Sequence, residues 1–320
     1  MGKSVSNEKK SVDLTSVITT AIQIPGVKVS RESFLRGQFS DLEPETISLI
    51  IEKGPVVAGC DKKILKKKAQ RIIKECTAIS TSASFAAGLP GGFAMVATIP
   101  ADMIQFYGVA LRMAQQLVYL YGEEDMWCEG TPDQEKITNQ LILYCGVMLG
   151  ATGAAQTVRV MSSALAKQAL KKLPQKALTK TFYYPVIKSI LKFFGVQVTK
   201  STFAKGVSKA IPVVGGVVSG GLTLASMLPM GNRLVDALEK AHFDYDAVDM
   251  ETDMDVIMDV CDEIIEEEIE NTHTDQSDDK KVQLSETIFA QIKEAKCMLD
   301  EGIITEEEFE ILKVKLINQL

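Results

Sequence analysis

The chain of 320 residues contains few side chains whose types and spacing suit catalysis. Asp102, Tyr107 and Arg112 lie on neighbouring turns of one expected helix, where they could bind a lipid-like ligand in a helical pocket and act on it. An aspartate near a helix N-terminus has a simpler explanation, because the helix dipole and free backbone N–H groups stabilise its charge. With two histidines and no nucleophile motif, the sequence predicts a protein that is not an enzyme.

A metal site is the next chemistry to consider. His242, Asp244 and Asp246 offer nitrogen and oxygen donors, but no further ligand is spaced to complete a set, so a surface helix is the better interpretation. The six cysteines include no CxxC pair, and the polar N-terminal stretch does not resemble a signal peptide. These features favour free thiols in a reducing cytoplasm. We expect neither a metal nor a cofactor.

Charge is distributed very unevenly along the chain. Between Glu135 and Asp236 there are 13 basic residues and no acidic residue, whereas residues 236–279 contain 18 acidic residues and one lysine. A basic segment of this kind predicts an anionic partner, and the acidic segment is its natural competitor within the same chain.

Lysine-rich helices are the candidates for that anionic contact. Residues 61–78 predict an amphipathic helix with Ile64, Leu65, Ile72 and Ile73 inside and lysines outside, a pattern that a solvated helix face also explains. Each lysine near an anionic leaflet contributes about 1 kcal/mol. Nucleic acid is a poor alternative, since aromatic residues are not interleaved and no nucleic-acid motif is present. The predicted membrane-surface residues are Lys62, Lys63, Lys66, Lys67, Lys171, Lys172, Lys188 and Lys192.

Three uncharged runs, residues 76–101, 137–158 and 210–232, must form the core that positions these lysines. Their lengths permit membrane spanning, but their glycines, prolines and hydroxyl groups oppose it. We expect helices packed in protein, with reversible insertion into lipid and constitutive spanning as alternatives. Gly146, Gly150 and Gly153 have the spacing that lets another helix approach closely. The core motif residues are Pro90, Gly91, Gly92, Pro100, Asp102, Gly122, Pro212, Gly215 and Gly216.

Helix punctuation divides the chain further. Pro44 and Gly54 mark the two ends of one helix, and residues 102–121 predict another that Gly122 ends. An acidic helical region follows at residues 234–270, where methionines at every fourth position predict a seam that faces the core. The methionines of this seam are Met250, Met254 and Met258.

The last 37 residues predict a separate helical hairpin. Gly302 supplies a left-handed stop, and Thr305 with Glu308 forms a capping box for the second helix. So short a segment cannot build its own core and must dock on a partner, a second copy or the rest of the chain. The predicted partner-binding residues are Ile292, Leu299, Ile304, Phe309, Leu312 and Leu316.

The predicted fold class is therefore all-α, with a glycine-rich helical core domain and a small C-terminal helical hairpin. Residues 1–40 are expected to form a partly flexible lead-in and residues 41–270 the core domain. Residues 271–283 form an acidic and polar linker, and residues 284–320 form the hairpin.

Several of these motifs resemble those of known families. The likeness to the EcsC family covers about residues 45–245 and is carried by Gly88–Gly92, Thr98–Asp102, Leu120–Gly122 and Ile211–Gly216. Leu299–Phe309 resembles the SHOCT short C-terminal module. The first resemblance implies a helical protein associated with membrane transport and secretion, and the second implies an oligomerisation or protein-interaction appendage. Neither resemblance supplies catalytic residues.

These observations favour a cytoplasmic adaptor or regulator that associates peripherally or reversibly with a membrane. Its expected partners are an anionic membrane surface or lipid and, through the hairpin, a protein or a second copy of the chain; no nucleic acid is expected. Two alternatives stay open. One is a membrane-permeabilising effector whose glycine-hinged helical hairpins insert into lipid on a trigger, and the other is a carrier or enzyme for a lipidic ligand.

Overall fold

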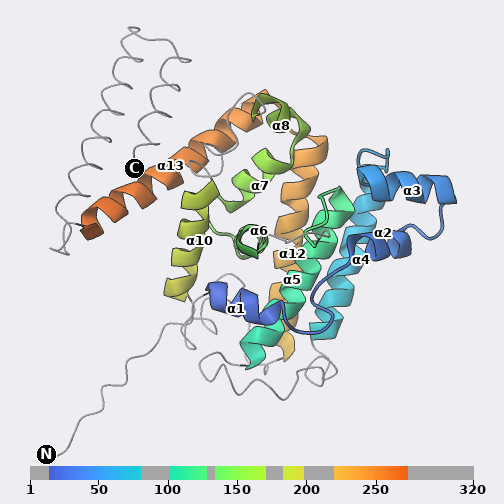
Figure 1. The fold of residues 1–320 in the computed structure, drawn as a ribbon, viewed down its shortest axis with the longest axis horizontal. Helices are drawn as coiled ribbons and strands as arrows, with labels where there is room; N and C mark the ends of the chain where they lie inside the picture. Colours follow the sequence, from blue (N-terminus) through green and yellow to red (C-terminus); the bar gives the residue numbers. More distant parts are fainter. Residues whose placement is uncertain (1–13, 81–100, 128–133, 171–182, 198–219, 273–320) are drawn as a thin grey trace, which may run out of the picture.

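The computed structural model describes residues 14–80, 101–127, 134–170, 183–197 and 220–272, and all regular structure within these ranges is α-helical (Figure 1). The all-α prediction is confirmed for this part of the chain. The helices are α1 (Leu14–Ala21), α2 (Arg31–Gln38), α3 (Pro44–Lys53), α4 (Lys62–Ser80), α5 (Ala101–Tyr121), α6 (Gln134–Leu149), α7 (Ala154–Ser162), α8 (Ala164–Leu170), α10 (Tyr184–Gln197), α12 (Gly220–Phe243) and α13 (Ala247–Thr272).

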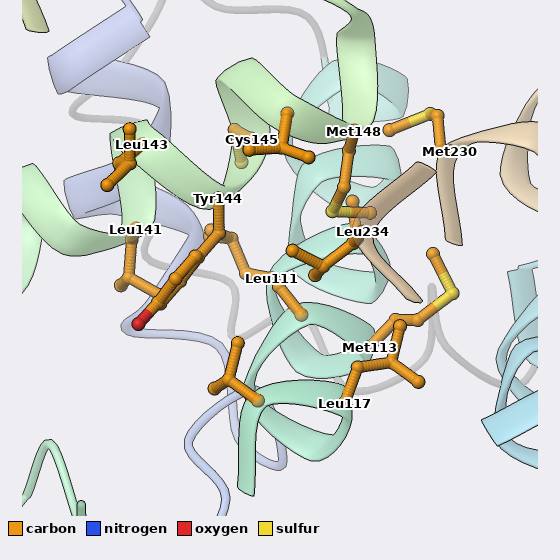
Figure 2. Packing of buried hydrophobic residues seen from close by; sticks show 14 of the residues in the cluster. Leu111, Met113, Leu117, Leu141, Leu143, Tyr144, Cys145, Met148, Met230 and Leu234 are labelled. Carbon is orange, nitrogen blue, oxygen red and sulfur yellow. The ribbon is translucent and has the colours of Figure 1, made fainter. Parts of the chain in front are cut away.

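Helix α5 lies at the centre of the core. It packs against α1, α4, α6 and α12, and its described side chains are buried almost all the way round. A helix that is apolar on every side needs such a complete cover of neighbouring helices. Figure 2 shows Leu111 and Leu117 of α5 among Tyr144 and Met148 of α6 and Leu234 of α12.

The predicted helix ends at Pro44, Gly54 and Gly122 are confirmed. Pro44 occupies the first turn of α3, and Gly54 and Gly122 end α3 and α5 with positive φ angles of 85° and 104°. Glycine adopts this left-handed conformation without steric cost. The two glycines also touch, because a Cβ at Gly54 would lie 2.9 Å from the Cα of Gly122.

Residues 14–39 belong to the core, although we expected a lead-in over residues 1–40. Leu14 and Ile18 of α1 are buried against α5, and so is Leu35 of α2. The side chain of Gln115 on α5 is also buried; its oxygen accepts from the N–H of Val29 at 3.1 Å and from the indole N–H of Trp127 at 2.8 Å. These bonds satisfy buried polar groups that would otherwise oppose folding.

The uncharged run at residues 137–158 is not one helix. Gly150 and Gly153 separate α6 from α7 with φ angles of 80° and 77°, which a residue with a side chain adopts at a cost. Gly146 has the predicted role in close helix approach, since a Cβ there would lie 2.6 Å from the side chain of Ile190 on α10, and a Cβ at Gly153 would lie 3.1 Å from Val260 on α13. The spacing of the three glycines therefore has two different causes.

Helix α13 crosses α7 and α10 and carries the acidic residues (Figure 1). Met250 and Met254 lie half-buried against the core, whereas the fully covered seam consists of Ile257, Val260 and Cys261. The predicted seam of methionines therefore lies one position along the helix from the most buried residues of α13. Helix α13 extends to Thr272, two residues into the expected linker.

No helix in the described part of the chain is both long enough and apolar enough to cross a bilayer. The uncharged runs at 76–101 and 210–232 are described only at their ends, at residues 76–80, 101 and 220–232.

Candidate functional site: the exposed face of helix α4

The exposed face of α4 carries several lysines that form no ion pair with any described residue. Its opposite face is apolar, with Leu65, Ile72 and Ile73 buried against α5 and α12 as predicted. Ile64 was predicted to face inward and does not, because its side chain is 51% exposed. The 3.6-residue period places Ile64 about 100° away from Leu65, on the edge of the outer surface.

The lysines at the two edges of α4 are engaged by neighbouring segments. Lys62 forms an ion pair with Asp244 at the end of α12, and Lys66 pairs with Glu239 on α12 at 3.0 Å. On the other edge, Lys68 donates to the backbone oxygen of Gln38. Lys62 and Lys66 are therefore not free membrane-surface lysines, in contrast to the sequence prediction.

Glu239 is held from two sides. Its carboxylate accepts a hydrogen bond from Tyr121 at 3.0 Å as well as from Lys66, and its side chain is only 8% exposed. The hydrogen bond with Glu239 raises the pKa of Lys66. Loss of either partner would leave the buried carboxylate with less compensation for its desolvation, so the ion pair with Lys66 holds α4 onto α12.

Between these edges, the outer face presents a continuous basic stripe. We define the α4 stripe as Lys63, Lys67, Arg71 and Lys74 together with Ile64; at 3.6 residues per turn they fall within about 100° of the helix circumference. All five side chains are exposed. Arg71 pairs with Glu75 along the helix at 2.7 Å, while Lys63, Lys67 and Lys74 form no ion pair with any described residue.

A second exposed apolar residue lies just before the stripe. Val57, in the loop that leads into α4, is 72% exposed. Basic side chains around an exposed apolar one, as around Ile64, can bind an anionic, partly apolar surface such as a lipid headgroup layer.

The remaining predicted lysines do not join this stripe. Lys188 and Lys192 are on α10, which Figure 1 shows on the far side of α5 and α12 from α4. Lys188 lies 5.4 Å from the ring centre of Tyr184, and Lys192 forms an ion pair with Glu267 of α13. The predicted lysines therefore do not form one surface; Lys171 and Lys172 lie outside the described residues.

Other predicted sites also fall outside the described part of the chain. Asp102 is the second residue of α5, but its side chain is not described. The undescribed core-motif residues are Pro90, Gly91, Gly92, Pro100, Pro212, Gly215 and Gly216. The undescribed hairpin residues are Ile292, Leu299, Ile304, Phe309, Leu312 and Leu316.

Of the residues considered for catalysis, Tyr107 and Arg112 have described side chains, and these two do not converge. Tyr107 is fully buried in the core, and this burial raises the pKa of its hydroxyl. Arg112, 5 positions along the same helix, donates to the backbone oxygen of Gly26. Burial raises the pKa of Cys76 and Cys145 to about 12, so both thiols stay protonated at neutral pH and are poor nucleophiles.

The three residues considered for metal binding have separate partners. Asp244 pairs with Lys62, and Asp246 accepts from the N–H of Asp249 at 2.8 Å as the N-terminal cap of α13. His242 points inward with its side chain 13% exposed, so its expected place on a surface helix was wrong. Among the residues with described positions, no group of three or more potential ligands could hold a metal ion.

His242 is part of a buried polar contact that the sequence does not reveal. Its Nε2 atom lies 4.0 Å from Oε1 of Glu123, and neither atom has a hydrogen-bond partner among the described residues. Burial lowers the pKa of His242, the negative charge of Glu123 opposes that effect, and Lys167 adds to it. The two residues come from distant parts of the chain, and no spacing rule connects them.

Comparison with family models, with curated proteins and with solved structures finds no match to this chain. The resemblance to the EcsC family and to the SHOCT module therefore stays a prediction.

Proposed function

We propose that this protein is a non-enzymatic adaptor or regulator of a membrane process such as transport or secretion, bound reversibly to the cytoplasmic face of a membrane. The α4 stripe is the lipid contact in this proposal. The observation that supports it best is the division of the α4 lysines: those at the edges are paired within the protein, and those on the outer face form no ion pair with a residue that the structure describes.

The expected strength of this contact is modest. Lys63, Lys67 and Lys74 together contribute about 3 kcal/mol at an anionic leaflet, and Arg71 contributes less because Glu75 neutralises it. Partial insertion of Ile64 and Val57 adds an apolar contribution. A contact of this size is reversible and depends on both lipid charge and ionic strength.

A second contact would make such weak binding useful. In the proposal, the hairpin predicted at residues 284–320 binds a partner protein or another copy of the chain. Two linked stripes on one membrane bind far more tightly than one, because the second binding event is intramolecular.

Vesicle flotation tests the lipid contact. The protein should float with phosphatidylserine vesicles at low salt and stay in the bottom fraction of the gradient at high salt. It should not bind vesicles of pure phosphatidylcholine. The triple variant Lys63→Ala, Lys67→Ala, Lys74→Ala should lose flotation and keep the thermal stability of the wild type, since these side chains are exposed.

A matched control separates the stripe from overall charge. Thr46→Asp, Ser48→Asp, Thr252→Asp changes the net charge by the same amount at exposed positions of α3 and α13. It should float like the wild type. Equal binding to neutral and anionic vesicles, or equal loss in both triple variants, would contradict the proposal.

A further inference from the structure

We infer that Asp244 competes with anionic lipid for Lys62: the carboxylate holds the Lys62 amine on the side of α4 that faces α12, next to the α4 stripe, and an anionic leaflet can take its place. This inference rests on the proposed function and assigns its regulation to one carboxylate. Lys62 directly precedes Lys63, the first residue of the stripe, but lies about 100° round the helix from it, on the side that faces α12. There its amine pairs with the carboxylate of Asp244.

The position of Asp244 is fixed by the elements around it. It follows the last residue of α12, and its backbone N–H donates to the oxygen of Lys240 at 3.1 Å. Helix α12 in turn packs along α4, so the carboxylate is held beside the beginning of that helix. The ring of Phe243 lies 5.9 Å from the Lys62 amine and supports the same side-chain position.

Because both side chains of this pair are partly exposed, anionic lipid can replace Asp244 as the partner of Lys62. The side chain of Asp244 is 54% exposed, so water can solvate the carboxylate when Lys62 leaves. An exposed ion pair shifts an equilibrium by no more than about fivefold. One lysine near an anionic leaflet has an effect of similar size, so lipid can compete with the carboxylate.

The neighbouring pair of Lys66 and Glu239 cannot exchange in this way. Glu239 is buried and also accepts from Tyr121, so withdrawing Lys66 would leave a buried charge with less compensation. The two edge lysines therefore differ. Lys66 stabilises the packing of α4 on α12, whereas Lys62 can leave Asp244 and add its charge to the lipid contact.

Asp244→Asn tests this inference in the full-length protein with phosphatidylserine vesicles. It should bind about fivefold more tightly than the wild type, because the charge of Lys62 is then free to interact with the anionic leaflet beside the stripe. Asp255→Asn is the matched control: it makes the same charge change at an exposed carboxylate of α13 that has no ion pair with a described residue. Adding Lys62→Ala to Asp244→Asn should remove the gain.

The outcomes separate the inference from the proposed function. Equal affinities of Asp244→Asn and wild type, with binding still abolished in the stripe variant, would overturn the inference alone. An equal gain in Asp255→Asn, or a gain that survives Lys62→Ala, would also overturn it, since net charge would then explain the effect. Failure of both the wild type and Asp244→Asn to bind these vesicles would overturn the proposed function together with the inference.

Discussion

At the scale of single residues, His242 makes the free energy of unfolding depend on pH. Its folded-state pKa is lowered, mainly by burial, so the unfolded chain binds a proton more readily than the folded one as the pH falls through about 6.5. The free energy of unfolding should therefore decrease on acidification from pH 7.5 to 5.5. In His242→Gln this decrease should be smaller, as urea denaturation at the two pH values will show. An unchanged decrease would contradict the prediction.

The contact of Arg159 with Asp253 is the second residue-scale test. The guanidinium of Arg159 on α7 donates to both carboxylate oxygens of Asp253 on α13, one bond measuring 2.8 Å, and Tyr245 also donates to Asp253 at 2.9 Å. Asp253→Ala leaves both donors without an acceptor and should lower the free energy of unfolding by about 3 kcal/mol.

The control for that prediction is an exposed pair. Glu32→Ala removes the partner of Arg36 on the surface of α2 and should cost less than about 1 kcal/mol. Chemical denaturation of both variants gives the comparison. A similar cost for the two substitutions would show that the contact of α7 with α13 is not a stabilising one.

Sequence patterns predicted few of these residue-scale contacts. They showed that α4 is lined with lysines, because the 3.6-residue period is local information. They did not show which lysines are paired, because the partners Glu239 and Asp244 lie far along the chain and reach α4 only through the packing of α12. The contact between Glu123 and His242 escaped prediction for the same reason.

At the scale of helices, close approach can be tested at two glycines. A Cβ at Gly146 would lie 2.6 Å from Ile190, and a Cβ at Gly231 would lie 2.6 Å from Ile73. Gly146→Ala should therefore separate α6 from α10, and Gly231→Ala should separate α12 from α4. Each should lower the free energy of unfolding by about 1–3 kcal/mol, measured by urea denaturation.

Gly37→Ala is the matched control, because no described atom lies within 4 Å of a Cβ at that position of α2. It should be neutral or stabilise by up to about 1 kcal/mol, since alanine favours the helix. Destabilisation at Gly37 equal to that at Gly146 would show that close packing is not the cause.

Helix boundaries were predictable where the sequence itself breaks the helix. Pro44, Gly54 and Gly122 end or begin helices for local reasons, namely a missing N–H or a positive φ angle. The break between α6 and α7 was missed, because glycines in an uncharged run suit either a close contact or a turn. The packing of α1 and α2 was also missed, since short helices with weak periodicity gain their stability from the tertiary contacts.

At the scale of the whole molecule, the predicted hairpin should control assembly. Leu299→Glu with Leu316→Glu, made in the full chain, places charge in the expected apolar seam and should lower the mass of any oligomer measured by light scattering. Affinity for phosphatidylserine vesicles should fall in parallel, because linked stripes act together.

Thr46→Glu with Ser48→Glu makes the same charge change on the exposed surface of α3 and should leave the mass unchanged. An assembly that persists in the hairpin variant and dissociates in this control would assign association to another surface.

Trp127 is the chain's only tryptophan, and its indole N–H donates to Gln115, which also binds the backbone of residues 27 and 29. The Lys28 amine lies 4.8 Å from the centre of the indole ring. Tryptophan fluorescence, excited selectively over that of the tyrosines, thus comes from one defined place, the junction where the N-terminal segment meets α5. Its emission wavelength will report docking of that segment in unlabelled protein, and stopped-flow mixing can time this event separately from the overall loss of helical circular dichroism.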